Sequence, residues 1–276
     1  MFPYLGLKAS TDSRQIDERL QYQPTVFEFY TQADDVAPSG LIHLRAMIDK
    51  VRNSGVQAIV IHHPMSYLHY HNEVAVKASQ HPRAYDFVMS STENLIEVAQ
   101  EKDVQLLVHG AYNEESAKIE AEFGSIDAAR TLAFKRLDYF QSLGGDHVMF
   151  ENSISPIFDF GNPVVDQLVQ QRGYRLAFDV SHAFIVLRGD NTLLQETMRL
   201  LGPQVVHYHL VDSMGMTHDS LPLGTGAIDW QGAASVMNPK ATNIYEIDLN
   251  DQYDSREMRE SHHYFSKIWR QEHGTM

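Results

Sequence analysis

The sequence predicts an α/β protein whose eight parallel strands alternate with helices and close into a (β/α)8 barrel, the TIM barrel. Two observations predict it. Eight short runs typical of buried strands alternate with helical patterns along the 276 residues. The third to eighth of these runs each end in His, Asp or Glu, at the strand end where this fold carries its functional groups. We expect residues 1–276 to form a single domain, because this length suits one such barrel.

In the first half of the chain, the second strand carries Glu28 between aromatic residues, either as a carboxylate pointing into the barrel or as a partnered core residue. A polar insert at 63–90 is long enough to cover a site, and a second long loop is expected at 111–125. The expected strands are 4–7, 26–30, 58–62 and 105–109, and the expected helices are 16–20, capped by Asp12 or Ser13, then 41–53 and 93–102.

In the second half, Asp127 is expected to cap a helix that reaches residue 143, where Gly144 and Gly145 end it. A loop up to Asp229 precedes a short helix. The other expected elements are strands at 147–151, 176–179, 205–209 and 242–247 and helices at 164–171, 193–201 and 255–271.

Composition restricts the function. A net charge of −14, from 22 basic and 36 acidic residues, disfavours nucleic acid as a partner. The chain has no cysteine, so any metal ligands must come from Asp, Glu and its 15 histidines. No leader pattern and no run of roughly 18 apolar residues is present. We expect a cytoplasmic protein without a membrane segment, and a homo-oligomer is possible.

Residues at the strand ends form a candidate metal centre. Four consecutive strands supply Glu151, Asp179, His209 and Glu246, a donor set suited to Mn, Co, Mg or Zn. His62 and His109 would form a second, more zinc-like site if Glu151 bridges two ions roughly 3.5 to 4 Å apart. His182 with His218 or Asp219 would form a third. We therefore expect one to three divalent ions per chain.

Each candidate ligand also has a purely structural interpretation. Asp179 could cap the following helix, His209 could be a satisfied core histidine, and Glu246 could pair with a lysine. Six such coincidences at six successive strand ends are much less probable than one shared site.

Five segments carry a family resemblance: MFEN with Glu151, FDVSHAF with Asp179 and His182, HLVDS with His209 and Asp212, PLGTGAIDW, and YEID with Glu246. Together they resemble the xylose isomerase-like barrel superfamily, which joins endonuclease IV to sugar isomerases and epimerases. The resemblance spans nearly the whole chain and implies a TIM barrel.

The tagatose and psicose epimerase branch implies one metal ion on Glu151, Asp179, His209 and Glu246. The two glutamates would exchange a proton on opposite faces of a ketose carbon, and His182 would bind a substrate hydroxyl. The metal would polarise the adjacent carbonyl. The arginine that this branch places shortly after the histidine is absent here, where residues 213–216 read SMGM.

The endonuclease IV branch implies a zinc cluster, and His62, His109 and His182 match its additional ligands. Its Asp-Arg-His element is replaced by His218, Asp219 and Ser220. Arg83 and Arg188 are the main cations expected near the site, too few for a DNA-cleaving groove. Aromatic residues instead indicate a pocket for a small polar molecule; they are Tyr67, Tyr70, Phe158, Phe160 and Phe184.

The sequence therefore predicts a metal-dependent sugar isomerase or epimerase, with Glu151, Glu246 and His182 as its catalytic residues. The alternative is a multi-zinc hydrolase of phosphate esters or DNA. A third possibility is a non-catalytic sugar-binding or regulatory barrel, which would not need all four residues of the ligand set.

Overall fold

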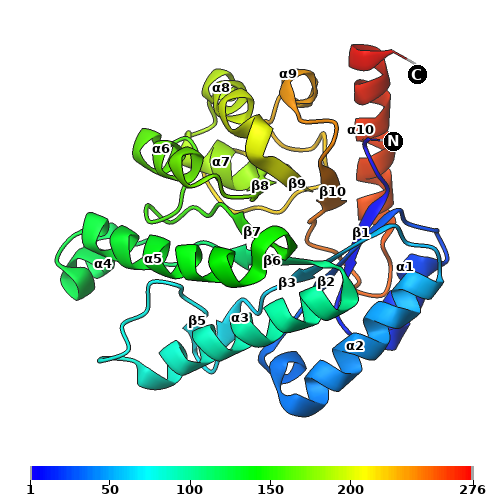
Figure 1. Cartoon of the computed structure of the whole chain (residues 1–276). Helices are drawn as coiled ribbons and strands as arrows, with labels where there is room; N and C mark the ends of the chain where they lie inside the picture. The colour runs from blue at the N-terminus through cyan, green and yellow to red at the C-terminus, as the bar shows by residue number, and fades with distance from the viewer. Residues whose placement is uncertain (1, 275–276) are drawn as a thin grey trace.

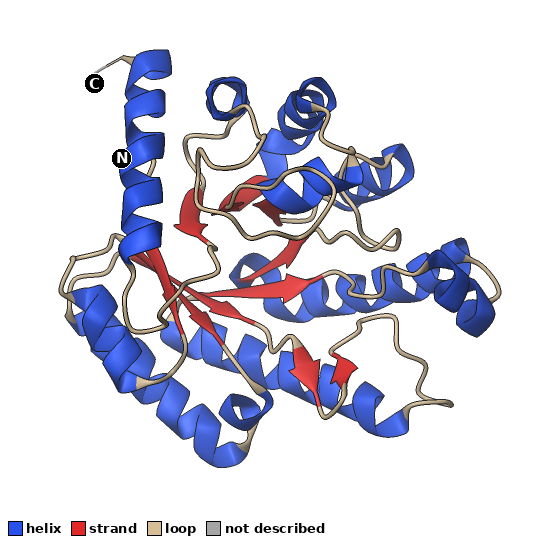
Figure 2. Cartoon of the chain, turned by 180° about the vertical axis from the view of Figure 1, so that it is seen from behind, coloured by secondary structure: helices blue, strands red, loops and turns tan. Residues whose placement is uncertain are grey.

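The computed structural model describes residues 2–274, which form the predicted barrel. Eight parallel strands lie side by side in chain order, with the helices around them (Figure 1). Figure 2 shows the same strands from behind, enclosed by the helices. The strands are β1 (Gly6–Ala9), β2 (Val26–Tyr30), β3 (Ala58–His62), β6 (Gln105–His109), β7 (Val148–Glu151), β8 (Leu176–Asp179), β9 (Val205–Leu210) and β10 (Thr242–Tyr245).

Local signals fix many of the helix ends. Proline occupies the first turn of three helices, where its missing N–H costs nothing. Side chains of Asp12, Ser125 and Asp190 cap three others. The helices are α1 (Ser13–Leu20), α2 (Pro38–Asn53), α3 (Pro82–Lys102), α4 (Ser116–Phe123), α5 (Ile126–Gly144), α6 (Pro163–Arg172), α7 (Val180–Val186), α8 (Asn191–Leu201), α9 (Trp230–Val236) and α10 (Arg256–His273), with 3-10 turns at Ala33–Val36, Gly145–His147 and Gly202–Gln204.

Several element predictions were wrong in detail. The insert expected at 63–90 ends earlier, because α3 begins at Pro82, and it contains a small hairpin of β4 (Ser66–Tyr67) and β5 (Tyr70–His71). The loop expected at 111–125 contains α4. Ser125 rather than Asp127 caps α5, and Asp127 lies in its first turn. The first strand lies two residues later than predicted, so it includes Lys8.

Strand alternation places the candidate residues inside the barrel. Val60, Leu107, Met149 and Ala177 form a small apolar cluster of their own. Two residues further along the same strands stand His62, His109, Glu151 and Asp179. Because side chains on a strand repeat every second residue, these four share the interior face at the C-terminal end of the barrel. A separate, larger core packs the outer faces of the strands against the helices.

The seam between β1 and β10 is closed by a side chain. Within residues 2–274 the ladder of backbone hydrogen bonds runs from β1 to β10 without joining these two strands. Instead, buried Asn243 accepts from the Tyr4 N–H at 2.8 Å and donates to the Tyr4 carbonyl at 3.0 Å. A Cβ atom at Gly6 would lie 1.9 Å from the Asn243 carbonyl oxygen, so only glycine permits this approach.

The N-terminal segment lies beside α10 (Figure 1). The ring of Phe2 packs 4.4 Å from that of Trp269, and both side chains are buried. None of the helices in the described part of the chain combines the length and hydrophobicity that a membrane span requires.

Replacing Asn243 by Ala should lower the free energy of unfolding by about 1–3 kcal/mol, because the Tyr4 backbone groups lose their partner at the seam. Urea unfolding followed by circular dichroism measures this difference. Asn53→Ala, at an exposed position of α2, is the matched control and should change little. Equal stability of the two variants would contradict the role given to Asn243.

Candidate metal centre

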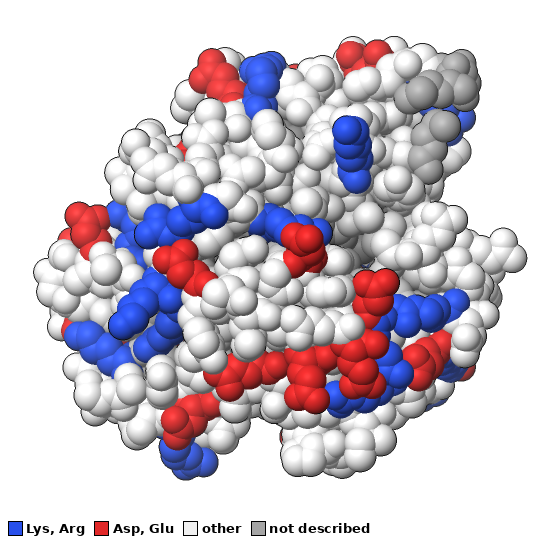
Figure 3. All heavy atoms as spheres, viewed as in Figure 1, with Lys and Arg blue, Asp and Glu red and all other residues white. Residues whose placement is uncertain are grey.

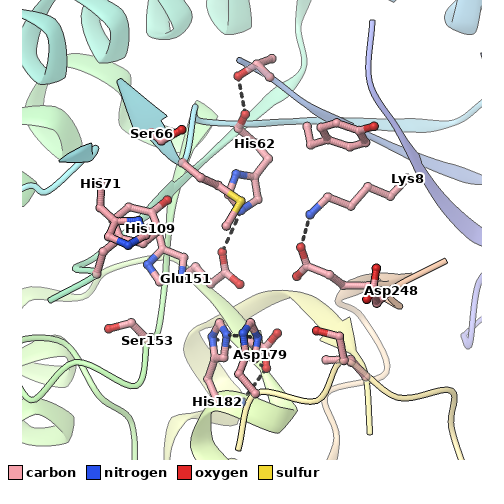
Figure 4. A pocket seen from close by; sticks show the side chains of 18 of the residues that line it. Lys8, His62, Ser66, His71, His109, Glu151, Ser153, Asp179, His182 and Asp248 are labelled. Atoms are coloured by element: carbon pink, nitrogen blue, oxygen red, sulfur yellow. Dashed lines mark hydrogen bonds and ion pairs between the residues drawn. The ribbon is translucent and has the colours of Figure 1, made fainter. Parts of the chain in front are cut away.

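A cavity of about 870 Å³ opens at the C-terminal ends of the strands. Figure 4 shows the side chains that point into it, including Lys8, His62, His109, Glu151, Asp179 and His182. Glu246 and His218 also line it, whereas His209 lies fully buried behind it. The structure thus brings the eight predicted site residues to one end of the barrel.

Glu151, Asp179, His209 and Glu246 each offer one ligand atom within 4.8 Å of the other three. Glu151 Oε1 lies 2.8 Å and Asp179 Oδ2 lies 3.9 Å from His209 Nδ1, and Glu246 Oε2 is in close contact with the same nitrogen.

Three buried atoms at this point make no hydrogen bond: Glu151 Oε2, Asp179 Oδ2 and His209 Nδ1. The short distances to His209 Nδ1 therefore lack hydrogen-bond geometry. Buried polar atoms are rarely left without partners, and a divalent cation would satisfy all three at once. These residues fit a metal ion.

Glu28 orients His209. Its Oε2 accepts from His209 Nε2 at 3.0 Å and from His207 Nε2 at 3.2 Å. Because a carboxylate only accepts, Nε2 of His209 carries the hydrogen and Nδ1 is free to bind a metal. Glu28 Oε1 lies 3.2 Å from the Lys8 ammonium. The carboxylate of Glu28 thus points into the barrel and is also partnered, as both sequence interpretations required.

Main-chain carbonyls orient three further histidines in the same way. Nδ1 of His62 donates to the His63 carbonyl at 2.8 Å, that of His109 to Ala111 at 2.7 Å, and that of His182 to Asn152 at 2.9 Å. Each Nε2 is left with a lone pair.

Two groups of donors could therefore hold a second ion beside the first. His109, Glu151 and His182 offer ligand atoms within 4.8 Å of one another. His62 Nε2 lies 3.2 Å from Glu151 Oε2, and two acceptors at this distance favour a cation between them.

His218 lies next to His182, with 3.0 Å between their Nε2 atoms. Asp219, the other residue considered for a third ion, is engaged elsewhere. Its carboxylate accepts from the Met214 N–H and the Thr217 hydroxyl, so it stabilises its own loop. Any third ion would thus use His182 and His218.

Charges in the cavity are strongly coupled. Burial alone would raise the pKa of Glu151, but the imidazole of His209 and that of His109 hold it well below its ordinary value. Burial would lower the pKa of His209, yet Glu151, Glu246 and Glu28 raise it well above 6.5. Burial lowers the pKa of His109 to about 3. His109 is therefore neutral at pH 7, as a metal ligand must be.

Asp179 and Asp212, which lie in the segments that carry the family resemblance, also stabilise the local structure. Asp179 caps α7, because its Oδ1 accepts from the His182 N–H at 2.7 Å while Oδ2 faces the other ligands. The structural interpretation and the ligand interpretation of Asp179 are therefore compatible. Asp212 accepts from Ser213, Gly224 and Ile228 backbone N–H groups and from the Trp230 indole, which organises the loop after β9.

Sequence reasoning missed Lys8, His207 and Tyr112. Lys8 is buried and pairs with Glu246 as well as Glu28, so the interpretation of Glu246 as the partner of a lysine was also correct. The sequence signal that could have identified Lys8 is a lysine within an otherwise apolar strand. Tyr112 lines the cavity and stacks on His109 with ring centroids 4.2 Å apart.

The predicted aromatic wall was largely wrong. Phe158, Phe160 and Phe184 are fully buried in the larger core and do not line the cavity. Tyr67 stacks on Phe87 and fixes the hairpin to α3. The tyrosines that do line the metal cavity are Tyr30 and Tyr112. Neither of the expected cations, Arg83 and Arg188, lines it.

Loading the chelator-treated protein with Mn²⁺ or Co²⁺ at 100 times its Kd should raise the free energy of unfolding by about 2.7 kcal/mol, because only the folded chain assembles the ligands. Urea unfolding with and without metal measures the gain. Asp179→Asn should lose most of it. Equal stability of the wild type in chelator and in metal would argue against a resident ion.

Replacing Glu28 by Gln should weaken metal binding about 10- to 100-fold, because the charge that orients His209 is lost while the shape is kept. Isothermal titration of the metal-free protein measures the Kd. Thr242→Val is the matched control, since Thr242 bonds His207 in the same layer of the barrel and touches none of the four ligands. An unchanged Kd in Glu28→Gln would remove Glu28 from this role.

No protein-family model matches the sequence, and no curated protein resembles it in sequence. Solved structures do resemble it. A D-tagatose 3-epimerase-like protein has a TM-score of 0.71 at 16% identity, covering 98% of both chains. An L-ribulose 3-epimerase has 0.71 at 9%, covering 98% of this chain and 95% of the other. A 3-keto-D-glucoside 4-epimerase from E. coli has 0.66 at 13%, covering 95% and 98%. This likeness confirms the predicted (β/α)8 barrel fold.

Proposed function

We propose that this protein is a divalent-metal-dependent isomerase or epimerase of a sugar or polyol-derived substrate. One observation carries the proposal: Glu151 and Glu246 face the same cavity and approach the same nitrogen of His209. Two carboxylates close to one position can act as the base and the acid that move a proton off and onto a carbon. The epimerases with the same fold support this assignment.

In the proposed reaction, one glutamate carboxylate takes the proton from the substrate carbon that carries a hydroxyl beside the carbonyl. The electron pair of the broken C–H bond moves into an enediolate. In an epimerase, the other glutamate returns a proton to the opposite face of that carbon and the carbonyl re-forms. In an isomerase, the proton returns to the neighbouring carbon, and the hydroxyl proton of the first carbon passes to the former carbonyl oxygen. When bound, a divalent ion supplies Lewis-acid polarisation of the substrate carbonyl.

The two glutamates have different surroundings. Glu151 is buried, whereas 28% of the Glu246 side chain is exposed to the cavity. Lys8 holds Glu246 in an ion pair, which keeps its carboxylate ionised and restricts its orientation. Glu246 is therefore the better candidate for the first base. His182, with Nδ1 tied to Asn152, offers Nε2 to a substrate hydroxyl or to a second ion.

A multi-zinc hydrolase of phosphate esters or DNA remains the second candidate, and one observation favours it. His62, His109 and His182 all present Nε2 to the cavity, which is more nitrogen donors than one ion on the four-residue set needs. The charge distribution argues the other way. On the face shown in Figure 3, Asp and Glu side chains form a band, and Lys and Arg stand in separate groups. This face is the one that helices α2, α3 and α5 cover (Figure 1). At the cavity itself, Lys8 is the only Lys or Arg that lines it within residues 2–274, which is too few for a nucleic-acid groove.

Replacing Glu246 by Gln should lower turnover about 10²- to 10⁴-fold, because the base is lost while the shape is kept. The assay incubates the metal-loaded protein with a panel of ketoses and aldoses in D2O and follows deuterium at carbons next to the carbonyl by NMR. Glu196→Gln, at an exposed position of α8, is the matched control.

Full exchange activity in Glu246→Gln would contradict its proposed role. Absence of exchange with every sugar in the wild type, together with cleavage of an abasic-site duplex, would instead favour the hydrolase.

A further inference from the structure

A second cavity of about 600 Å³ adjoins the metal cavity. His71, Tyr112 and Glu114 line both, so the two spaces share a wall. Each volume falls within the range of about 300–1,000 Å³ typical of small-molecule sites. The second cavity lies between the β4–β5 hairpin, the start of α3 and α4.

Aromatic rings lead from one cavity to the other. Tyr112 stacks on His109 at 4.2 Å and 12°, and His71 stacks on the other side of Tyr112 at 5.4 Å and 11°. Further out, Tyr70 and His81 lie 5.7 Å apart and both line the second cavity. The hydroxyl oxygen of Tyr112 is buried without a hydrogen-bond partner. Two imidazoles cover the ring of Tyr112, so the exposed ring of Tyr70 offers the face for stacking.

The charged groups of the second cavity are mostly acidic. Its wall contains Glu73, Glu114, Glu115 and Glu122, and the only cation lining it within residues 2–274 is Lys118. Lys118 is already paired with Glu115 at 2.5 Å. Glu73 holds the loop after β6, because its Oε2 accepts from the Tyr112 and Asn113 N–H groups. The remaining carboxylates are acceptors for hydroxyl groups and repel anions.

The metal cavity also lacks an unpaired Lys or Arg among the residues that line it. Among residues 2–274, Lys8 is the only Lys or Arg that lines it, and its ammonium is taken by Glu28 and Glu246. A phosphate or carboxylate on the substrate would thus find no protein cation in either cavity. Burying an unpaired anion beside carboxylates is unfavourable.

We propose that the second cavity binds the second ring of a neutral, unphosphorylated disaccharide or glycoside whose first ring reacts in the metal cavity. This inference rests on the proposed function and names its substrate class. The apolar C–H face of the second ring would lie against the exposed ring of Tyr70, and its hydroxyls would donate to Glu114 and Glu122. The glycosidic linkage would lie against the residues that line both cavities.

Isothermal titration of the metal-loaded wild type tests the inference, with fructose, the glucosyl-fructose palatinose and fructose 6-phosphate as probes. Palatinose should bind about tenfold more tightly than fructose, through the added stacking surface, and fructose 6-phosphate should bind more weakly than fructose.

Ala84→Trp places a bulky ring in the second cavity, and Tyr70→Ala removes a stacking face. Both should remove the advantage of palatinose and leave fructose binding unchanged. Ala128→Trp, at an exposed position of α5, is the matched control.

Palatinose binding no tighter than fructose binding in the wild type would overturn the inference, as would an advantage that survives in both cavity variants. Tighter binding of fructose 6-phosphate would overturn the unphosphorylated class. The deuterium assay on the same samples distinguishes a failure of the second subsite from a failure of the proposed function. Exchange with fructose but no palatinose advantage removes only the second subsite. A palatinose advantage without exchange supports the subsite and removes the isomerase or epimerase.

Discussion

The crowding of carboxylates at one end of the barrel is the constraint on which the rest of the site depends. Glu28, Glu151, Asp179 and Glu246 are brought together in a region of low solvent access. Like charges this close cannot all stay ionised without positive partners. Within the described part of the chain, the Lys8 ammonium is a positive partner and pairs with both Glu28 and Glu246. The donor atoms still lacking a partner define where a divalent ion fits.

The barrel supplies the precision that such a site needs. The candidate ligands come from rigid strand ends, and each imidazole is held by its second nitrogen. Main-chain carbonyls hold His62, His109 and His182, whereas a carboxylate, Glu28, holds His209. His209 also stands at the centre of the oxygen-rich ligand set, because Glu151, Asp179 and Glu246 surround its Nδ1.

Loops outside the barrel shape the substrate space. The hairpin after β3, fixed to α3 by Tyr67 on Phe87, carries His71 into the wall shared by the two cavities. The loop after β9, organised by Asp212, carries His218 to His182. The cations that line these cavities are already paired, so binding energy must come from the metal, from ring stacking and from hydrogen bonds. Neutral polyhydroxy molecules match these sources best.

The sequence by itself determined the eight strands, their order and the strand-end residues, because side chains on a strand repeat every second residue and parallel strands end at one edge. Only the tertiary structure decided which groups pair. Lys8 meets Glu246 across the seam that Asn243 closes, a contact between residues 238 positions apart that no local pattern encodes. The positions of Phe158 and Phe160 were also decided by the tertiary structure. An aromatic residue in a loop can line a cavity or pack in the larger core, and the packing of the helices decides between the two.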